Sequence, residues 1–499
     1  MSPWLLLIFV LAYFMILLLV AWRTSRNSNN DTFFIGNKNS NWMLVAFGMI
    51  GTSLSGVTFV SVPGGVGVPA GIDKGAFAYF QITLGYLVGY IAIAYILLPL
   101  YYRLNLTSIY NYLSGRLGFT SYKTGASFFL LSRTLGATAR LYLVVNILQE
   151  AILNKLGVPF WATTLIILVM ILLYTFEGGV KTIVWTDTLQ TVCMLLGLII
   201  CAAYLLKSMD MGFGTAVTTM REQGLSKIFF ADPNSKLFFV KQIIAGAFIT
   251  LTMTGMDQEM MQKNISVRTL KDSQKNMVTL SIILLIVILL FLFLGGLLYM
   301  YAAKFNVTAI GDKLFPVVAL EHMPPFIGII FIIALISALF PSADGAITAL
   351  TSSFCIDIIG MQRRTDMTDA AKQRLRRQVH LTVAFIFLVF VMVFKWVNNP
   401  SMIGVILKVA AYTYGPLLGL FTFGIITKRN VNGKLVPAVC IAAPLICFFI
   451  DKFQKELFGG FEIGLELLVI NGLLTFIGLW LIPGKKNLIE SVSLKKETL

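Results

Sequence analysis

Charged residues are scarce in this chain. Only 12% of its 499 residues are Asp, Glu, Lys or Arg, whereas 57% are hydrophobic. Average proteins carry about 25% charged residues, so the composition excludes a soluble globular class. The apolar residues instead gather in long runs, which indicates a protein that lies in a membrane.

Histidine and cysteine are rare as well. The two histidines, His322 and His380, lie far apart and give little support to a zinc site or a histidine-based catalytic site. The cysteines fall in apolar stretches without metal-ligand spacing, as expected for buried thiols. They are Cys193, Cys201, Cys355, Cys440 and Cys447. Clustered nucleophile motifs are also missing, so we do not expect an enzyme.

About 13 apolar stretches are long enough to cross a bilayer as helices. They lie near residues 4–22, 42–68, 76–100, 124–153, 159–176, 183–206, 237–262, 277–303, 325–357, 379–397, 402–426, 435–450 and 463–483. The first stretch has no basic leader or small-residue cleavage site, so it is interpreted as a retained helix. We therefore predict an all-α polytopic membrane protein with one transmembrane domain over residues 1–499.

The chain has a formal net charge of +16, and its basic residues are concentrated in alternate loops. Alternate loops and the C-terminal tail hold about twice as many basic residues as the opposite side. These residues are Arg23, Arg26, Arg103, Arg116, Lys123, Lys263, Arg268, Lys271, Lys275, Arg363, Arg364, Lys372, Arg374, Arg376, Arg377, Lys428, Arg429, Lys485 and Lys486. The positive-inside rule then predicts an outside N-terminus and a cytoplasmic C-terminus. Compact loops favour a cell (inner) membrane of a bacterium, and no nucleic-acid partner is expected.

One apolar stretch carries small hydroxylated residues at its centre. Within residues 42–68, the segment Gly51-Thr52-Ser53-Leu54-Ser55-Gly56 interrupts the run, and Pro63-Gly64-Gly65 follows it. Irregular backbone at membrane depth is tolerated where it lines a cavity or is buried in protein. Transporters hold ions and solutes at such broken helices. Close helix packing is the alternative explanation for the glycines, but the polar centre favours a transporter site.

A second stretch is interrupted in the same way at residues 246–257, which contain Gly, Thr and Asp. After the first stretch, two groups of five stretches each begin with an interrupted one. This arrangement is typical of inverted-repeat transporters. We predict an extra N-terminal helix at 1–23, repeats at 42–207 and 237–428, and two C-terminal helices at 435–483. Helix packing is the preferred explanation for Gly85, Gly89, Gly295 and Gly296.

Three motifs together resemble those of the sodium:solute symporter family. One includes Gly178-Gly179, Trp185-Thr186-Asp187 and Gln190, another begins at Gly415-Pro416, and the third spans Thr107 to Leu113. They occur in the family's order over nearly the whole chain. The resemblance implies a leucine-transporter-like inverted-repeat fold with ten core helices, two of them broken. It also implies sodium as coupling ion, in a family that includes carriers of sugars, proline, sialic acid and vitamins.

The resemblance places the family's sodium site between the first broken helix and the eighth core helix. The matching ligands are the carbonyls of Gly51, Leu54 and Ala338 and the hydroxyl of Ser342. Hard cations prefer oxygen ligands, and broken helices offer carbonyl oxygens without a net charge. Pro341 stands where the family usually has a second hydroxyl. A water or a nearby carbonyl would have to replace that ligand.

Two aspartates are candidate ligands for a second cation. Asp187 matches an aspartate of a second sodium site in some relatives, and Asp344 stands where those relatives have a serine. A carboxylate inside a membrane is costly, so both are candidate cation ligands. Two converging carboxylates would hold a cation or share a proton. A helix cap at Asp187 and a local kink at Asp344 are the alternatives.

Candidate solute ligands lie around the same break. The resemblance to sialic-acid-carrying relatives places Ser53, Ser55 and Thr58 at the cavity and Gln81 on the facing helix. Their hydroxyl and amide groups fit a polar solute.

Two arginines of the third core helix could pair with a solute carboxylate, because a guanidinium binds a carboxylate in a bidentate manner. Arg133 is nearer the cytoplasmic end and is expected to extend toward the surface. Arg140 is therefore the candidate solute ligand, and a structural ion pair is the alternative for either arginine.

These observations predict a secondary active symporter that couples inward sodium flow to uptake of a small polar organic solute by alternating access. A sugar, a sugar acid and an amino-acid-like compound all fit. A proton-coupled symporter and a solute sensor on the same fold are the alternatives. The expected partners are the solute, sodium and the lipid bilayer, and the chain is expected to function as a monomer.

Overall fold

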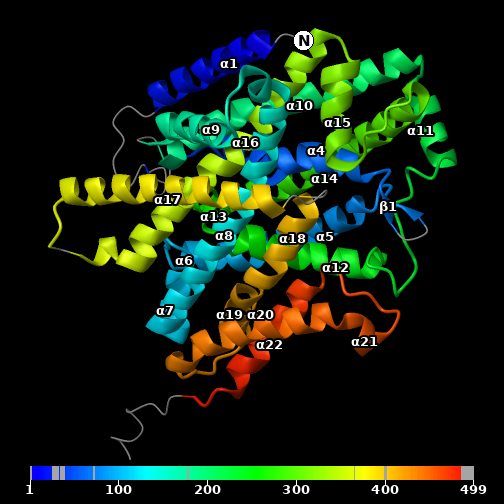
Figure 1. Ribbon diagram of the computed structural model, residues 1–499. Helices are drawn as coiled ribbons and strands as arrows, with labels where there is room; N and C mark the ends of the chain where they lie inside the picture. The colour runs from blue at the N-terminus through cyan, green and yellow to red at the C-terminus, as the bar shows by residue number, and fades with distance from the viewer. Residues whose placement is uncertain are drawn as a thin grey trace, which may run out of the picture.

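The computed structural model of the protein describes residues 3–24, 33, 40–70, 73–176, 179–364, 366–397 and 402–484. Gly178 of the first motif and the basic residues Arg26, Lys485 and Lys486 lie outside the described residues. Almost all of the described chain is helical (Figure 1). Its β structure is one short antiparallel pair, β1 (Pro69–Ala70) and β2 (Asp73–Lys74).

Eight helical segments in the described part of the chain are long and apolar enough to cross a membrane. They are α1 (Pro3–Thr24), α5 with its continuation through α6 (Tyr79–Arg103), α8 with its continuation (Phe119–Leu156), α10 (Gly179–Met209), α14 (Leu270–Phe305), α16 with its last turns (Pro325–Ile359), α17 (Asp369–Val397) and α20 with the turn before it (Gly433–Lys452). Two shorter apolar helices are α9 (Phe160–Thr175) and α22 (Leu467–Leu481).

Three further spans consist of two helices that meet at an angle. The pairs are α3 (Trp42–Leu54) with α4 (Gly56–Gly65) at 55°, α12 and its last turn (Phe239–Gly255) with α13 (Gln258–Ile265) at 66°, and α18 (Met402–Thr413) with α19 (Gly415–Ile426) at 45°. The two predicted breaks are therefore present, and the third bend is additional. It coincides with Gly415-Pro416 at the start of α19, where proline lacks the amide needed to continue the preceding helix.

Each predicted apolar stretch coincides with one of these helices or pairs. Length and composition support eight to eleven spans, so the count of about 13 stays a prediction. Short helices lie in the connections: α7 (Asn111–Leu117), α11 (Phe213–Glu222), α15 (Leu314–Val317) and α21 (Gln454–Phe458).

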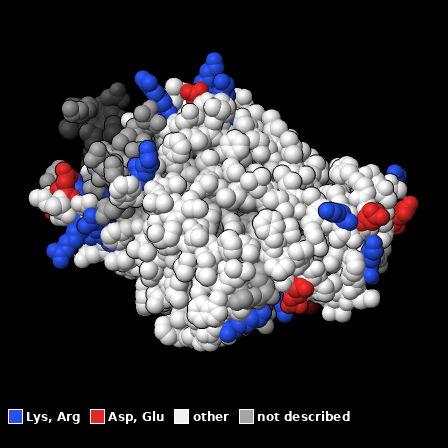
Figure 2. Space-filling view, turned by 90° about the horizontal axis from the view of Figure 1, so that it is seen from above, with Lys and Arg blue, Asp and Glu red and all other residues white. Residues whose placement is uncertain are grey.

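The surface has the composition expected of a lipid-facing bundle. Figure 2 shows a broad face in which most visible atoms belong to uncharged residues, with Lys, Arg, Asp and Glu gathered at its margins. Large apolar side chains are exposed along the helices, for example Trp4 and Leu19 of α1 and Leu173 of α9. Exposing such a surface to water is unfavourable, whereas exposing it to the hydrocarbon core of a bilayer is not.

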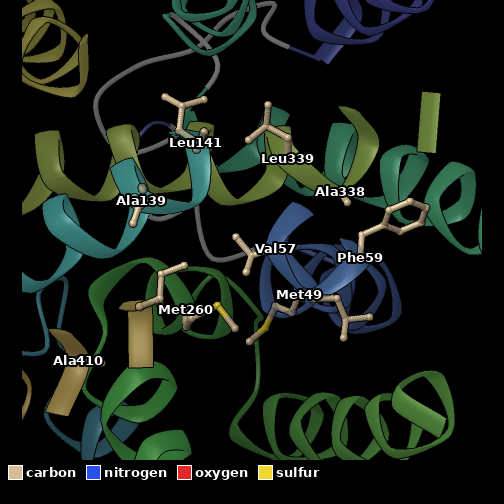
Figure 3. Close-up of a cluster of buried hydrophobic side chains, with 14 of the residues drawn as sticks. Met49, Val57, Phe59, Ala139, Leu141, Met260, Ala338, Leu339 and Ala410 are labelled. Atoms are coloured by element: carbon tan, nitrogen blue, oxygen red, sulfur yellow. The ribbon is translucent and has the colours of Figure 1, made fainter. Parts of the chain in front are cut away.

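The first broken span occupies the centre of the bundle. Helices α3 and α4 contact α8, α10, α14, α16 and α18. Figure 3 shows apolar side chains gathered around this segment, among them Met49, Val57 and Leu339. At its periphery, α1 packs on α9, α10 and α16, whereas α20 and α22 pack beside α19 (Figure 1). Helix α1 and the pair α20 and α22 therefore cover opposite sides of the bundle.

Glycines allow the closest helix contacts, as predicted for Gly85. Helices α5 and α12 approach backbone to backbone at Gly85 and Gly246, where a Cβ on Gly85 would lie 2.1 Å from the carbonyl oxygen of Ile243. At the first break, a Cβ on Gly56 would lie 2.5 Å from Cγ2 of Val144. Larger residues at these positions would push the helices apart.

Candidate functional site

The first break is centred on Ser55. This residue has φ 20° and ψ 163°, which ends α3 and starts α4 in a new direction. In the described structure, no backbone amide binds the carbonyls of Thr52, Ser53 or Leu54, because the helical pattern stops there. The carbonyl of Gly51 accepts the amide of Ser55 at 3.2 Å and keeps a second lone pair. The break therefore presents several oxygen atoms that are free to bind a cation or a solute.

Helix α16 brings the other predicted sodium ligands to this break. A Cβ placed on Gly51 would lie 3.4 Å from Cγ of Pro341, so α3 and α16 touch at this point. The hydroxyl of Ser342 donates to the carbonyl of Leu339 at 2.8 Å. That bond uses the hydrogen and leaves the oxygen lone pairs for a cation. Ala338 is fully buried one turn earlier.

Pro341 also changes which oxygen atoms are available as ligands at this site. Because proline has no amide hydrogen, it cannot bind the carbonyl four residues earlier, which belongs to Ser337. The carbonyl of Ser337 is thereby freed from the helical hydrogen-bond pattern. It is an uncharged oxygen of the kind that was expected to replace the missing hydroxyl.

A cavity of about 100 Å³ lies directly beside the break. This volume is several times the roughly 10–15 Å³ needed for one water molecule. Its walls come from α3, α4, α5, α8, α12, α13, α14 and α18. The lining residues are Thr52, Ser53, Leu54, Ser55, Val57, Thr58, Tyr79, Tyr86, Tyr90, Arg133, Arg140, Ile249, Thr250, Met253, Thr254, Met260, Leu284, Ile288, Ile403, Ile406 and Leu407. The cavity therefore brings Ser53, Ser55, Thr58 and Arg140 together.

Gln81 lies away from this cavity. Its side chain is fully buried, and its amide oxygen accepts the backbone N–H of Phe230 at 3.2 Å. The amide nitrogen donates to the carbonyls of Leu237 at 3.1 Å and Ala78 at 3.3 Å. These bonds fasten the loop before α12 to the start of α5. We therefore do not retain Gln81 among the candidate solute ligands. Helix α5 instead lines the cavity with Tyr79, Tyr86 and Tyr90. The hydroxyls of Ser53 and Tyr90 are 3.5 Å apart.

The two arginines of α8 have different surroundings. Arg133 is buried and forms an ion pair with Glu259, and its Nε lies 3.9 Å from Oδ2 of Asp257. The expectation that Arg133 extends to the surface is therefore wrong, because two carboxylates hold it inside. Arg140 also lines the cavity, and in the described part of the chain it makes no hydrogen bond or ion pair.

The second break carries the carboxylates that bind Arg133. Asp257 caps the start of α13 by accepting the amides of Glu259 at 2.9 Å and Met260 at 3.4 Å. Its other oxygen accepts the hydroxyl of Tyr414 at 2.8 Å, from the bend between α18 and α19. A second tyrosine, Tyr101, donates to the carbonyl of Gly255 at 2.8 Å. Side chains from other helices therefore bind the carbonyl of Gly255 and the carboxylate of Asp257 at the break.

Asp187 of α10 is paired with a lysine. The Nζ of Lys263 lies 2.7 Å from Oδ2 of Asp187 and 2.6 Å from the hydroxyl oxygen of Thr52. Lys263 belongs to the buried helix α13, so its assignment to a cytoplasmic loop was wrong. It entered the count of loop charges because it directly follows an apolar stretch in the sequence.

Asp344 of α16 is fully buried and accepts the hydroxyl of Tyr174 at 2.7 Å. The next residue, Gly345, lies against Glu259, since a Cβ there would come within 2.2 Å of Oε1 of Glu259. The two candidate aspartates thus have separate partners, Lys263 for Asp187 and Tyr174 for Asp344.

Sequence reasoning missed Asp257, Glu259 and Lys263 as site residues. A signal was available, because Asp257 and Glu259 lie inside the apolar stretch 237–262, where acidic residues are costly. Lys263 follows Glu259 by one helical turn, and their charged groups are 3.7 Å apart.

The comparisons with known proteins agree with this architecture. The sequence pattern of the sodium:solute symporter family matches residues 33–439. The sodium/sialic acid symporter NanT of Aliivibrio fischeri is 25% identical over 472 residues, which are 90% of this chain and 88% of that protein. The sodium/sialic acid symporter SiaT of Proteus mirabilis is 23% identical over 461 residues, 88% of each chain. The human sodium/iodide cotransporter is 26% identical over 327 residues, 63% of this chain and 50% of that protein.

Solved structures show the same fold. A substrate-bound, outward-open structure of a Na⁺-coupled sialic acid symporter superposes with a TM-score of 0.81 at 18% identity, over 95% of this chain and 96% of that one. The nucleobase-cation-symport-1 family transporter Mhp1, in a closed conformation, superposes with a TM-score of 0.55 at 11% identity, over 91% and 93%. The bundle thus has the leucine-transporter-like fold. This chain belongs to the sodium:solute symporter family and is a sodium-coupled symporter of a small organic solute.

Proposed function

We propose that the solute is a polyhydroxylated carboxylate, such as a sugar acid. The observation that carries this proposal is the contrast between Arg133 and Arg140. Both guanidinium groups line the cavity, but among the described residues only Arg133 has a carboxylate within 4 Å. A buried or half-buried cation without a counter-ion is costly in a membrane. A solute carboxylate would supply the missing counter-ion and bind the guanidinium in a bidentate manner.

The opposite side of the cavity suits the hydroxyl groups of such a solute. Ser53, Ser55 and Thr58 offer hydroxyls that both donate and accept hydrogen bonds. The rings of Tyr79, Tyr86 and Tyr90 provide flat apolar surfaces with hydroxyls at their tips. Two of the relatives are named for sialic acid, which supports a sugar acid over an uncharged sugar.

For the coupling ion, we propose a site formed by the carbonyls of Gly51, Leu54 and Ala338 and the hydroxyl of Ser342. The break frees carbonyl oxygens at one side, and α16 brings the hydroxyl to the other. Ion and solute would then bind to the same broken helix, so each would stabilise the conformation that the other prefers. We include the inverted repeats at 42–207 and 237–428 in this proposal as the two units that alternate the access to the site.

The proposal extends to the orientation of the chain. The basic loops favour an outside N-terminus and a cytoplasmic C-terminus in the cell membrane. One chain contains both the cavity and the proposed sodium ligands, which supports function as a monomer. The buried polar groups would serve binding rather than catalysis, so the chain is proposed to act as a carrier and not as an enzyme.

Matched pairs of solutes test the carboxylate directly. Thermal unfolding of the purified protein would be measured with sugar acids and with their methyl esters, in sodium and in potassium. A ligand at 100 times its Kd stabilises the native state by about 2.7 kcal/mol. We expect at least one acid, N-acetylneuraminic acid among those tested, to raise the unfolding temperature in sodium, and its ester to have little effect. Equal stabilisation by acids and esters would contradict the proposal.

A further inference from the structure

Lys263 lies where the sequence predicted a second cation. Asp187 and Asp344 were expected to hold a sodium ion or to share a proton. In the structure, the ammonium group of Lys263 contacts Asp187 at 2.7 Å and Thr52 at 2.6 Å. The lysine side chain is only 3% exposed and the aspartate side chain is fully buried. The cation at Asp187 is therefore covalently part of the chain.

This ammonium group connects the three elements that surround the ion-binding region. Lys263 belongs to the second broken span, Asp187 to α10, and Thr52 to α3 just before the first break. Thr52 in turn donates to the carbonyl of Gly48 at 3.2 Å. The contact network thus reaches the same turn of α3 that carries Gly51, one of the proposed sodium ligands.

The ligands of the ammonium are those that a sodium ion would use. A lysine ammonium is a compact single positive charge that binds only acceptors. Here it binds a carboxylate oxygen and a hydroxyl oxygen, and Oε1 of Glu259 lies 3.7 Å away. Oδ1 of Asp187 and Oε1 of Glu259 are buried without a hydrogen-bond partner in the described structure. The surroundings therefore demand at least one positive charge at this point.

We propose that Lys263 is a tethered cation that fills the second ion position, so that this symporter couples its solute to one sodium ion. That sodium ion binds at Gly51, Leu54, Ala338 and Ser342, so the inference rests on the proposed sodium site. A second free sodium is excluded, because two like charges a few ångströms apart repel strongly where water is absent. Removing the lysine charge leaves Asp187 and Glu259 able to attract a sodium ion instead.

Counting bound sodium tests this inference without knowledge of the solute. Equilibrium binding of radiolabelled sodium would be measured on the purified full chain, with the Hill coefficient of sodium-dependent thermal stabilisation as a second readout. We expect one sodium ion per wild-type chain and a Hill coefficient near one. The double variant Lys263→Met with Asp187→Asn removes both charges of the pair, and replacing a buried pair together is often tolerated. It should still bind one sodium ion with an affinity within about threefold of the wild type.

The single variant Lys263→Ala supplies the positive test. It vacates the ammonium position and keeps Asp187, so the count at pH 8.5 should rise from one sodium ion to two. Lys263→Arg keeps the charge and is the matched control, with an expected count of one. Adding Asp187→Asn to Lys263→Ala should return the count to one. Size-exclusion elution and helical content would verify that each variant is folded.

Several results would overturn the inference that Lys263 fills the second ion position. Two sodium ions on the wild-type chain, or one sodium ion that the double variant loses, would place an ion at Asp187 and overturn the inference. A count that stays at one in Lys263→Ala would also overturn it, since the lysine would then not be what occupies the position. In each of these cases sodium still binds the wild-type chain, so sodium-coupled symport of a carboxylate stands. Loss of the single ion in the double variant would, in addition, move the coupling ion from the proposed site to Asp187. Absence of bound sodium in the wild type would overturn both the inference and the proposed function.

Discussion

The guanidinium of Arg133 in α8 and the carboxylate of Glu259 in α13 form a buried ion pair that joins the third core helix to the second broken span. Asp257 lies at 3.9 Å from the same guanidinium and accepts the hydroxyl of Tyr414. Two turns further along α8, Arg140 has no such partner in the described structure. Arg133 thus holds the second broken span against α8, whereas Arg140 remains available to bind a ligand.

Replacing Arg140 should therefore weaken solute binding without loss of the fold. Arg140→Gln removes the charge that would bind the carboxylate, and hydrogen bonds to charged groups contribute about 1.5–3 kcal/mol. We expect affinity for an anionic solute to fall about 10- to 100-fold. Arg140→Lys keeps the charge but not the planar fork, so its loss should be intermediate. Calorimetric titration measures the affinities, and unchanged binding by the glutamine variant would rule out this role.

Replacing Arg133 should instead destabilise the protein. Arg133→Met removes the guanidinium that Glu259 and Asp257 share, and breaking a buried ion pair typically costs about 3–5 kcal/mol. Adding Glu259→Gln should recover part of that loss, because the two residues interact directly. Thermal unfolding of the two single variants and the double variant gives the coupling energy. Strictly additive losses would show that the ion pair contributes little.

The hydroxyl of Ser342 should affect sodium more than folding. Ser342→Ala removes one proposed ion ligand, and we expect sodium binding to weaken by about 1–3 kcal/mol. Ser337→Ala on the same helix is the matched control, because that hydroxyl donates to Tyr13 of α1 at 2.7 Å and the substitution keeps the backbone carbonyl. The measurement is the sodium concentration that gives half-maximal thermal stabilisation. Equal values for the two variants would remove Ser342 from the ion site.

Filling the cavity should abolish solute binding. Ser53→Leu or Ser55→Leu places a branched apolar side chain in a space of about 100 Å³ and removes a hydroxyl. Ser208→Leu near the end of α10 is a control outside the cavity, where the Ser208 hydroxyl donates to the carbonyl of Leu205. Solute-dependent thermal stabilisation should disappear in the cavity variants and persist in the control. If both cavity variants still bind solute, the small residues serve helix packing instead.

The spans and the two predicted breaks follow from local properties of the chain. Hydropathy over about 20 residues decides whether a segment can cross the membrane. The hydroxylated segment at residues 51–56 and the Gly- and Thr-rich segment at 246–257 showed where two spans are interrupted, and α3–α4 and α12–α13 bend there. The third bend had a local signal too, in Gly415-Pro416, but that motif entered only as a family resemblance.

The partners of the buried charges depend on the tertiary structure. Lys263 and Asp187 are 76 positions apart, and Arg133 and Glu259 are 126 apart. Sequence identified Asp187 as a candidate, yet it placed Lys263 in a loop and expected Arg133 to extend to the surface. A charge on a membrane helix must find a partner inside the bundle or reach the interface. Only the packing of α8, α10 and α13 around the first break decides between these outcomes, and it leaves Arg140 in the cavity without a carboxylate of its own.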